Sequence, residues 1–176
     1  MVDWDELMCH EGPAVWRTVY RLVRNQADAE ECFQETFLAA FEVSNRQPVR
    51  NWTALLQRLA TSRAIDRIRS QMRRRRREES VDLTRTANCE VEPSQHAEAT
   101  ELAAALRWAI AQLPARQAEV FCLHELAEWT SPQIAEHLGM TSNAVGVVMH
   151  RARQTLQQLL KIERQMSTML NRQGPQ

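Results

Sequence analysis

The sequence predicts an all-α protein made of two small helical domains joined by a flexible linker, with a helix-turn-helix in the C-terminal domain. Ala, Leu, Gln, Glu and Arg, all good helix formers, dominate the 176 residues, and glycine occurs only four times. Apolar residues recur at spacings of three and four along much of the chain. The exception is residues 78–100, an acidic stretch without that periodicity, which we interpret as the linker.

The N-terminal domain is predicted to span residues 1–77. Its first helix covers residues 4–24 and is expected to break near Gly12 and Pro13. Apolar side chains at helical spacing give this segment one face that packs on the core.

A second helix is predicted to begin at Asp28, because Asp28 and Glu31 form a pattern close to a capping box. Phenylalanines recur every four residues along it and are expected to face the core. Another face carries acids and one leucine. Such a face is usually just solvated, but it also suits a basic helical partner. The phenylalanines are Phe33, Phe37 and Phe41, and the acidic face holds Glu31, Glu35, Leu38 and Glu42.

A polar loop is predicted over residues 44–51, where Asn51 can cap a third helix over residues 52–77. Residues 46–77 hold eleven arginines and one acid, so positive charge is concentrated here although the formal net charge of the chain is zero. Arginine pairs with phosphate and stacks on bases, so this block predicts a surface that binds a polyanion. A solvated helix face is the alternative, but it does not account for five consecutive arginines at 73–77.

The C-terminal domain is predicted to span residues 101–165, followed by a tail at residues 166–176. Its first helix is expected over residues 100–113, with Leu102 among the inward-facing side chains. A second helix follows over residues 116–126.

A short helix, a glycine turn and a longer helix then form a helix-turn-helix pattern. Thr130 and Gln133 make a capping box, and Gly139 ends the short helix. The longer helix is expected to begin at residues 141–142 and to end near Glu163. The N-terminal part of such a helix lies in the DNA major groove. The residues expected at DNA there are Thr141, Ser142, Asn143, Gly146, Val147, His150, Arg151 and Arg153.

Catalysis, metal binding and membrane insertion find no support in the sequence. There is no glycine-rich phosphate loop, and the histidines have no paired metal spacing with acids. Cys9, His10, Cys89 and His96 could form a zinc site only if the fold gathered them, and the spacing favours free thiols packed as small apolar groups. No stretch offers the roughly 18 apolar residues that a membrane span needs. We therefore expect a cytoplasmic protein that is not an enzyme and has no cofactor or metal.

Three segments resemble the extracytoplasmic-function (ECF) group of bacterial sigma factors. Residues 28–38 (DAEECFQETFL) resemble that family's core-polymerase-binding helix, and residues 59–69 (LATSRAIDRIR) resemble its promoter-melting helix. Residues 113–121 (LPARQAEVF), together with the helix-turn-helix over residues 134–153, resemble its C-terminal domain. The segments follow the family's order and cover most of residues 3–162.

This resemblance implies a sigma factor that binds core RNA polymerase and directs promoter recognition, strand opening and transcription initiation. It implies that the second helix binds the polymerase clamp and that the 44–51 loop holds a base flipped from the −10 element, which costs a few kcal/mol. The C-terminal domain would read the −35 element and touch the polymerase flap. The linker would follow the RNA path of the enzyme, and an anti-sigma factor is the expected regulator. The implied polymerase-binding residues are Asp28, Glu31, Gln34, Glu35 and Leu38, and the implied −10-binding residues are Asn45, Arg46, Asn51, Ser62, Arg63, Arg67, Arg73 and Arg74.

One segment departs from that family, because residues 144–148 read Ala-Val-Gly-Val-Val where the family often has a charged Thr-Val-Lys-Ser-Arg run. Fewer phosphate contacts predict weaker −35 binding with a flatter salt dependence. Two other functions stay open. One is a helix-turn-helix repressor or activator that binds DNA as a homodimer without polymerase, and the other is a helical adaptor that binds only proteins. Neither function needs the motifs within residues 28–69.

Overall fold

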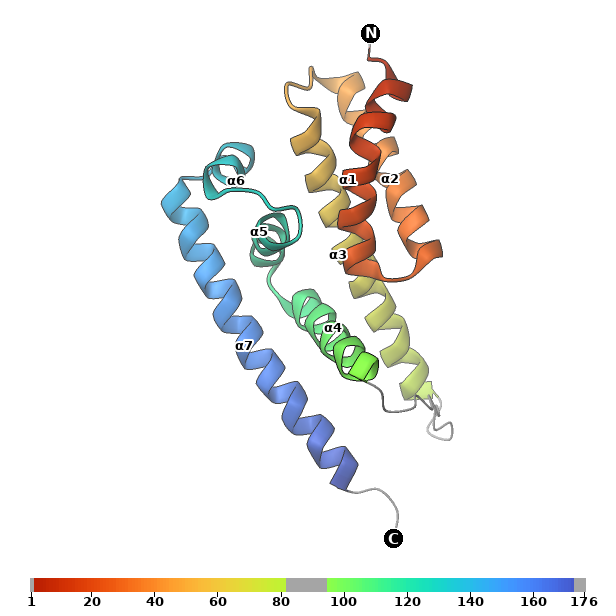
Figure 1. The fold of residues 1–176 in the computed structure, drawn as a ribbon, viewed down its shortest axis with the longest axis vertical. Helices are drawn as coiled ribbons and strands as arrows, with labels where there is room; N and C mark the ends of the chain where they lie inside the picture. Colours follow the sequence, from red (N-terminus) through yellow and green to blue (C-terminus); the bar gives the residue numbers. More distant parts are fainter. Residues whose placement is uncertain (1, 82–94, 173–176) are drawn as a thin grey trace.

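The computed structural model describes residues 2–81 and 95–172, and these residues form seven helices and no strand (Figure 1). The all-α prediction is therefore confirmed. Residues 82–94, the middle of the predicted linker, lie outside the described residues. The helices are α1 (Trp4–Val23), α2 (Gln26–Arg46), α3 (Trp52–Val81), α4 (Gln95–Gln112), α5 (Ala115–Glu125), α6 (Ser131–Leu138) and α7 (Ser142–Arg172).

Helices α1, α2 and α3 pack on one another and form the N-terminal unit (Figure 1). The predicted break in α1 is wrong, because the helix runs straight through Pro13. Buried residues lie on both sides of the proline, from Gly12 to Val15 and Val19. Packing of this continuous apolar face offsets the one helical hydrogen bond that proline cannot make.

The start of α2 differs from the prediction that Asp28 begins the helix. Asn25 is the N-cap, and its side chain accepts a hydrogen bond from the Asp28 backbone N–H at 3.0 Å. Asp28 thus lies in the first turn, where a carboxylate is favoured by the helix dipole. Its side chain is then free to interact with α3.

Only part of the predicted phenylalanine row on α2 faces the core. Phe37 is buried and Phe33 is half-buried, whereas Phe41 is 48% exposed. A spacing of four residues advances about 40° further than one turn of a 3.6-residue helix, so the third side chain rotates out of the core. Phe41 instead meets the ring of Trp4 edge-on, with centroids 5.5 Å apart.

The connection between α2 and α3 is shorter than the predicted 44–51 loop. Helix α2 continues to Arg46, so Asn45 and Arg46 lie in its last turn. It ends at Gln47, whose extended backbone (φ −155°, ψ 150°) is the conformation favoured before a proline. Asn51 caps α3 as predicted, because its Oδ1 accepts from the Ala54 N–H at 2.9 Å.

Helices α4 to α7 form the C-terminal unit, in which α4, α5 and α6 pack on the long α7 (Figure 1). Helix α4 begins at Gln95, before the predicted residue 100, and α7 continues past Glu163 to Arg172. Leu102 is 58% exposed, so its predicted inward position is wrong. The buried side chains described for α4 begin only at Ala105, because the preceding turn lies beyond the core.

The helix-turn-helix is confirmed in its local details. Thr130 and Gln133 form the capping box, and Gly139 takes the left-handed conformation (φ 61°, ψ 40°) that closes α6. The Thr141 hydroxyl accepts from the Ala144 N–H at 3.2 Å and caps α7. Apolar side chains lie where α6 packs on α7: Ile134, Ala135, Val145 and Met149 are buried, and Leu138 and Val148 are half-buried.

Two exposed glycines should respond to alanine in opposite directions. Gly139→Ala should lower the free energy of unfolding by about 1 kcal/mol, because an L side chain is strained at a positive φ. Gly146→Ala should raise it by about 1 kcal/mol, since Gly146 is inside α7 and an added Cβ would meet nothing within 4 Å. Urea unfolding measures the free energy of unfolding of both variants. Changes of the same sign for Gly139→Ala and Gly146→Ala would contradict the local structure described above.

Candidate functional site

The outer face of α2 combines acids with exposed apolar side chains. Leu38 is 65% exposed, and Phe41 lies three residues further on, so the two are neighbours on the helix surface. Glu31 and Gln34 are exposed on the same helix, and Glu35 is half-exposed. A single exposed leucine means little, but an apolar pair flanked by carboxylates is a surface on which a basic helix can dock.

The structure brings two predicted sets of residues together, because arginines of α3 pair with the acids of α2. Arg67 places one guanidinium nitrogen 3.5 Å from Asp28 Oδ1 and another against Glu31 Oε2. Arg63 Nε lies 4.0 Å from Glu35 Oε2. The sequence assigned the arginines to DNA and the acids to polymerase, and it did not anticipate that they pair with each other.

Arg67 is the most enclosed member of this group, with a side chain only 22% exposed. Burial acts to lower the pKa of Arg67, but hydrogen bonds to Glu31 and Cys32 outweigh burial and raise it. Burial also raises the pKa of the Cys32 thiol beneath the guanidinium. Gln71 donates to Asp28 Oδ2 at 2.6 Å and completes the contact. The cluster therefore holds a permanently charged arginine between α2 and α3.

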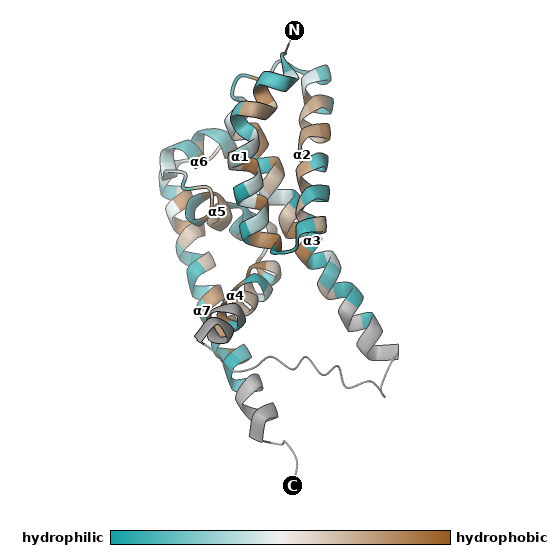
Figure 2. Cartoon of the chain, turned by 45° about the vertical axis from the view of Figure 1, so that its right-hand side comes forward, coloured by the Kyte–Doolittle hydropathy of each residue, from teal (hydrophilic) through white to brown (hydrophobic). Residues whose placement is uncertain are grey.

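The residues predicted to bind the −10 element lie at the end of α2, at the start of α3 and along the length of α3. Asn51 is exposed at the start of α3, and Asn45 and Arg46 are exposed at the end of α2. Arg73 and Arg74 are exposed 22 and 23 residues beyond Asn51, which at 1.5 Å per residue is about 35 Å away. Figure 2 shows that the part of α3 that continues past α1 and α2 is largely hydrophilic where it is coloured. Ser62 and Arg63 are exposed between the two ends, and Arg67 is half-buried.

All eight residues predicted to bind the −35 element are exposed at the N-terminal part of α7. Val147 is among the exposed large apolar side chains of the protein. Arg153 forms an ion pair with Glu125 at the end of α5, with 2.7 Å between Arg153 Nη2 and Glu125 Oε1. The hydrogen bond from Arg153 lowers the pKa of Glu125. This surface has the geometry that a helix-turn-helix presents to a major groove.

Two arginines that the sequence did not single out connect the N-terminal and C-terminal units. Arg69 donates to the carbonyl oxygens of Ala111 at 3.2 Å and Leu113 at 2.9 Å, at the end of α4. Arg21 donates to the Leu126 carbonyl at 2.9 Å, after α5. Both satisfy carbonyls left unpaired at a helix end. No local sequence pattern reveals such contacts, because they depend on how the units meet.

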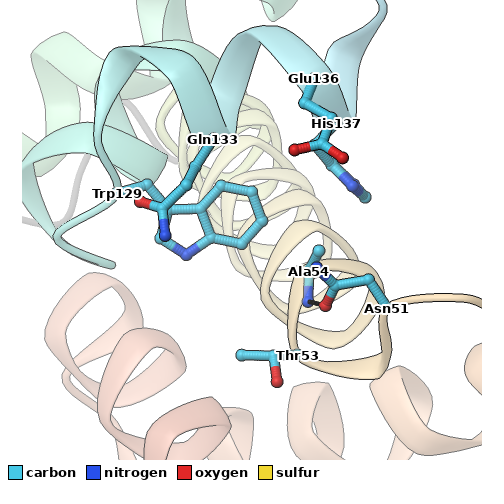
Figure 3. Close-up of a pocket in the computed structure, with 7 residues that line it drawn as sticks. All are labelled: Asn51, Thr53, Ala54, Trp129, Gln133, Glu136 and His137. Carbon is cyan, nitrogen blue, oxygen red and sulfur yellow. Dashed lines mark hydrogen bonds between the residues drawn. The ribbon is translucent and has the colours of Figure 1, made fainter.

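A cleft of about 380 Å³ lies where the start of α3 faces α6 (Figure 3). Asn51 and Thr53 line one side, and Trp129 and His137 line the other. The His137 Nε2 atom is buried and has no hydrogen-bond partner within the described residues. Asn51, predicted to hold a flipped base, therefore opens onto the helix-turn-helix unit in this arrangement.

The described part of the chain contains no group of three or more His, Cys, Asp or Glu side chains placed to bind a metal ion. Cys9 is an exposed free thiol, and Cys32 and Cys122 are buried free thiols. Burial raises the pKa of Cys122 to about 12. Cys89 lies outside the described residues, and the side chain of His96 is not described, so the alternative zinc site is untested. None of the helices described is both long and apolar enough to span a bilayer.

The fold and these surfaces define a two-unit helical protein with a helix-turn-helix. Residues 7–74 match the model of sigma-70 region 2, and residues 103–156 match that of sigma-70 region 4. The ECF RNA polymerase sigma factor SigE of Mycolicibacterium smegmatis is 32% identical over 161 residues, covering 91% of this chain. The chain spans only 62% of the length of that relative.

Two solved structures share the fold. The sigma factor RpoE of Bartonella quintana, crystallised with the anti-sigma factor NepR, is 24% identical with a TM-score of 0.52, and the match covers 91% of this chain and 98% of RpoE. CnrH, solved in complex with the cytosolic domain of CnrY, is 22% identical with a TM-score of 0.55, covering 90% and 87%. These two structures show a shared fold. The matched sigma-70 regions 2 and 4 and the SigE relative confirm the resemblance: the chain belongs to the ECF group of the sigma-70 family.

The half-buried His137 should make stability depend on pH below neutrality. Burial and then Arg58 lower its pKa below the ordinary value of 6.5, and Glu119 and Glu136 do not offset this. The folded state thus favours the neutral ring, so the free energy of unfolding should fall as the pH drops from 7 through 6.5 towards the lowered pKa. In His137→Gln this decline should be smaller.

His10→Gln is the matched control, because the His10 side chain is 84% exposed. Urea unfolding between pH 7.5 and 5.5 measures the decline, and NMR titration measures the ring itself. A His137 midpoint at or above 6.5 would contradict the burial argument.

Proposed function

We propose that this chain binds core RNA polymerase and directs transcription initiation at promoters, acting by binding and not by catalysis. The observation that carries the proposal is that the acid-and-leucine face of α2 and the DNA-facing end of α7 are both exposed in one chain that matches both sigma-70 regions. The name of the SigE relative supports it. Polymerase and promoter place this activity in the cytoplasm.

The domain roles follow the predicted boundaries. Residues 1–77 bind polymerase and the −10 element, and residues 101–165 bind the −35 element. The acidic linker of residues 78–100 joins them, and residues 166–176 are the tail. Two helices extend into the predicted linker, because α3 continues to Val81 and α4 begins at Gln95.

The polymerase site consists of exposed residues on one helix. Carboxylates at Glu31 and Glu35 pair with the basic groups of a polymerase helix, while Leu38 packs against its apolar side chains. Asp28 lies deeper, at 23% exposure, and orients Arg67. Gln34 adds a neutral hydrogen bond at the rim. Because exposed ion pairs contribute little individually, burial of Leu38 against the polymerase helix supplies much of the affinity.

The −10 site uses the start of α3 for a base and the rest of the helix for phosphates. The Asn51 carbonyl oxygen is engaged as the cap, so its amide N–H groups are the donors available to a flipped base. Asn45 and Arg46 stand beside it at the end of α2. Arg73 and Arg74, about 35 Å along the helix, hold phosphates of a strand several nucleotides long. Ser62, Arg63 and Arg67 lie between the two ends.

An anti-sigma factor is the proposed regulator, and the structural relative RpoE, solved with the anti-sigma factor NepR, supports this. Such a partner controls a sigma factor by competing for the same polymerase-binding and DNA-binding surfaces. The stimulus and the promoter sequence depend on the partner and on the genome.

Reversing one acid tests the polymerase site. Glu35→Arg should reduce association with core polymerase at least tenfold, because it places a cation where a basic partner helix docks. Glu101→Arg, at an exposed acid of α4, is the control with the same charge change. Size-exclusion chromatography and fluorescence titration with core enzyme measure the complex. Normal assembly of Glu35→Arg would overturn this assignment, and a wild-type homodimer without affinity for core enzyme would favour the repressor alternative.

Two substitutions on α7 separate base contacts from phosphate contacts. Asn143→Ala should cost about 1–3 kcal/mol on the preferred −35 duplex and much less on a mismatched one, because an amide reads base edges. Arg151→Ala should weaken both duplexes equally and lower the slope of log affinity against log salt by about 1. Fluorescence anisotropy measures the binding, with the exposed Gln158→Ala further along α7 as the control. Equal effects of both variants on the two duplexes would show that Asn143 reads no base.

A further inference from the structure

The N-terminal and C-terminal units meet at one end by close packing and at the other end across a cleft. Helix α3 packs on α4 and α5, and Arg69 supports this contact through the carbonyl oxygens of Ala111 and Leu113. Nearer its start, α3 faces α6 across the cleft of about 380 Å³ (Figure 3). A junction built in this way can turn about its packed end, so that α6 moves away from the start of α3.

Arg21 closes the junction between these two ends. Its guanidinium donates to the Leu126 carbonyl oxygen at 2.9 Å and lies 3.6 Å from Glu128 Oε1, and both partners belong to the segment between α5 and α6. The Arg21 and Glu128 side chains are 44% and 79% exposed, so their ion pair contributes little to stability. The contact that opposes movement of α6 is therefore a weak one.

His137 lines the α6 side of the cleft and has no hydrogen bond to its inner nitrogen. The Nε2 atom is buried and has no partner within the residues that the structure describes. Trp129 packs edge-on against the ring, with centroids 5.4 Å apart. A neutral imidazole loses one hydrogen bond in such a position, whereas an imidazolium loses part of the hydration of a charge, which costs more.

The charged groups around His137 also disfavour a further positive charge. Arg58 acts on the ring from α3, the opposite wall of the cleft, and lowers the pKa of His137. Glu119 acts from α5, but its Oε2 already lies 3.2 Å from Arg116 Nη1. Glu136 is the neighbouring residue of α6 and is exposed, so water screens its carboxylate. Helix α7 also packs on α6, and among the described residues it adds no charge that acts on the ring.

We propose that the junction is a pH-sensitive hinge, in which protonation of His137 moves α6 away from the start of α3. In the closed state the ring lacks a partner and faces Arg58, whereas in the open state water solvates the ring and Arg58 is farther away. The closed state thus favours the neutral ring. Its population is constant above about pH 6.5 and falls as the pH drops below that value. Opening widens the cleft beside Asn51, and it concerns the free chain whether or not polymerase is its partner.

The distance across the cleft tests the hinge. Spin labels are attached at Arg50→Cys, just before α3, and at Ser142→Cys, at the start of α7, in a full-length chain that also carries Cys9→Ser and Cys89→Ser. The two remaining cysteines are buried and are not labelled. Double electron–electron resonance measures the distance between the labels from pH 7.5 to 5.5. Below pH 6.5 a longer distance should replace the shorter one, with a population ratio that rises by up to about tenfold per pH unit.

Four variants of the labelled chain assign the change to its cause. His137→Gln should keep the shorter distance down to pH 5.5, whereas His10→Gln, at a side chain that is 84% exposed, should open like the wild type. Arg58→Gln should shift the opening to lower pH, because the cation facing the ring is gone. Arg21→Gln should raise the open fraction already at pH 7.5, since it removes the contact that closes the junction.

A constant distance in the wild-type chain from pH 7.5 to 5.5 would overturn the inference, and so would equal opening in His137→Gln. If His137→Gln is already open at pH 7.5, Arg58→Gln decides, because an opening midpoint there at or above the wild-type midpoint would contradict the hinge. Far-UV circular dichroism separates opening from unfolding, since loss of helix together with the longer distance would also contradict it. Core polymerase is absent from these measurements, so their failure leaves the proposed function unaffected.

Discussion

The contact of Arg67 with the carboxylates of Asp28 and Glu31 is the constraint on which the N-terminal unit depends. The sequence sorts charge into blocks, with eleven arginines and one acid over residues 46–77. A helix with so many like charges repels itself unless anions lie close by. The acidic face of α2 supplies some of those anions within the fold. In the free chain, the acidic face of α2 and the arginines of α3 therefore stabilise each other by ion pairing.

Arginine side chains also form hydrogen bonds at the junction between the two units. Arg69 and Arg21 donate to carbonyls at helix ends of the C-terminal unit, so these two arginines connect the units. In this arrangement the end of α7 that we propose to bind DNA is exposed, whereas Asn51 opens onto the cleft beside α6. Neutralising a connecting arginine therefore affects how the two units meet.

Sequence patterns predicted what is local and missed what depends on tertiary packing. The capping box at Thr130 and the glycine at 139 fix α6 within a few residues, so its boundaries were predictable. The break expected in α1 and the inward Leu102 were wrong because packing, not propensity, decides both. For the candidate site, the acidic face of α2 was predictable from helical spacing and the arginine block of α3 from composition, and the resemblance implied their partners. The pairing of these acids with these arginines was not predictable, because it depends on the register of α2 against α3.

A double-mutant cycle between Glu31 and Arg67 tests the central claim most directly. The free energy of unfolding of the free chain is measured for the wild type, Glu31→Gln, Arg67→Gln and the double variant. The account predicts a favourable coupling energy of about 0.5–1 kcal/mol at low salt, decreasing in 1 M salt because part of the pair is exposed. A coupling energy of zero at low salt would contradict it, since the two side chains would then not interact in the free chain.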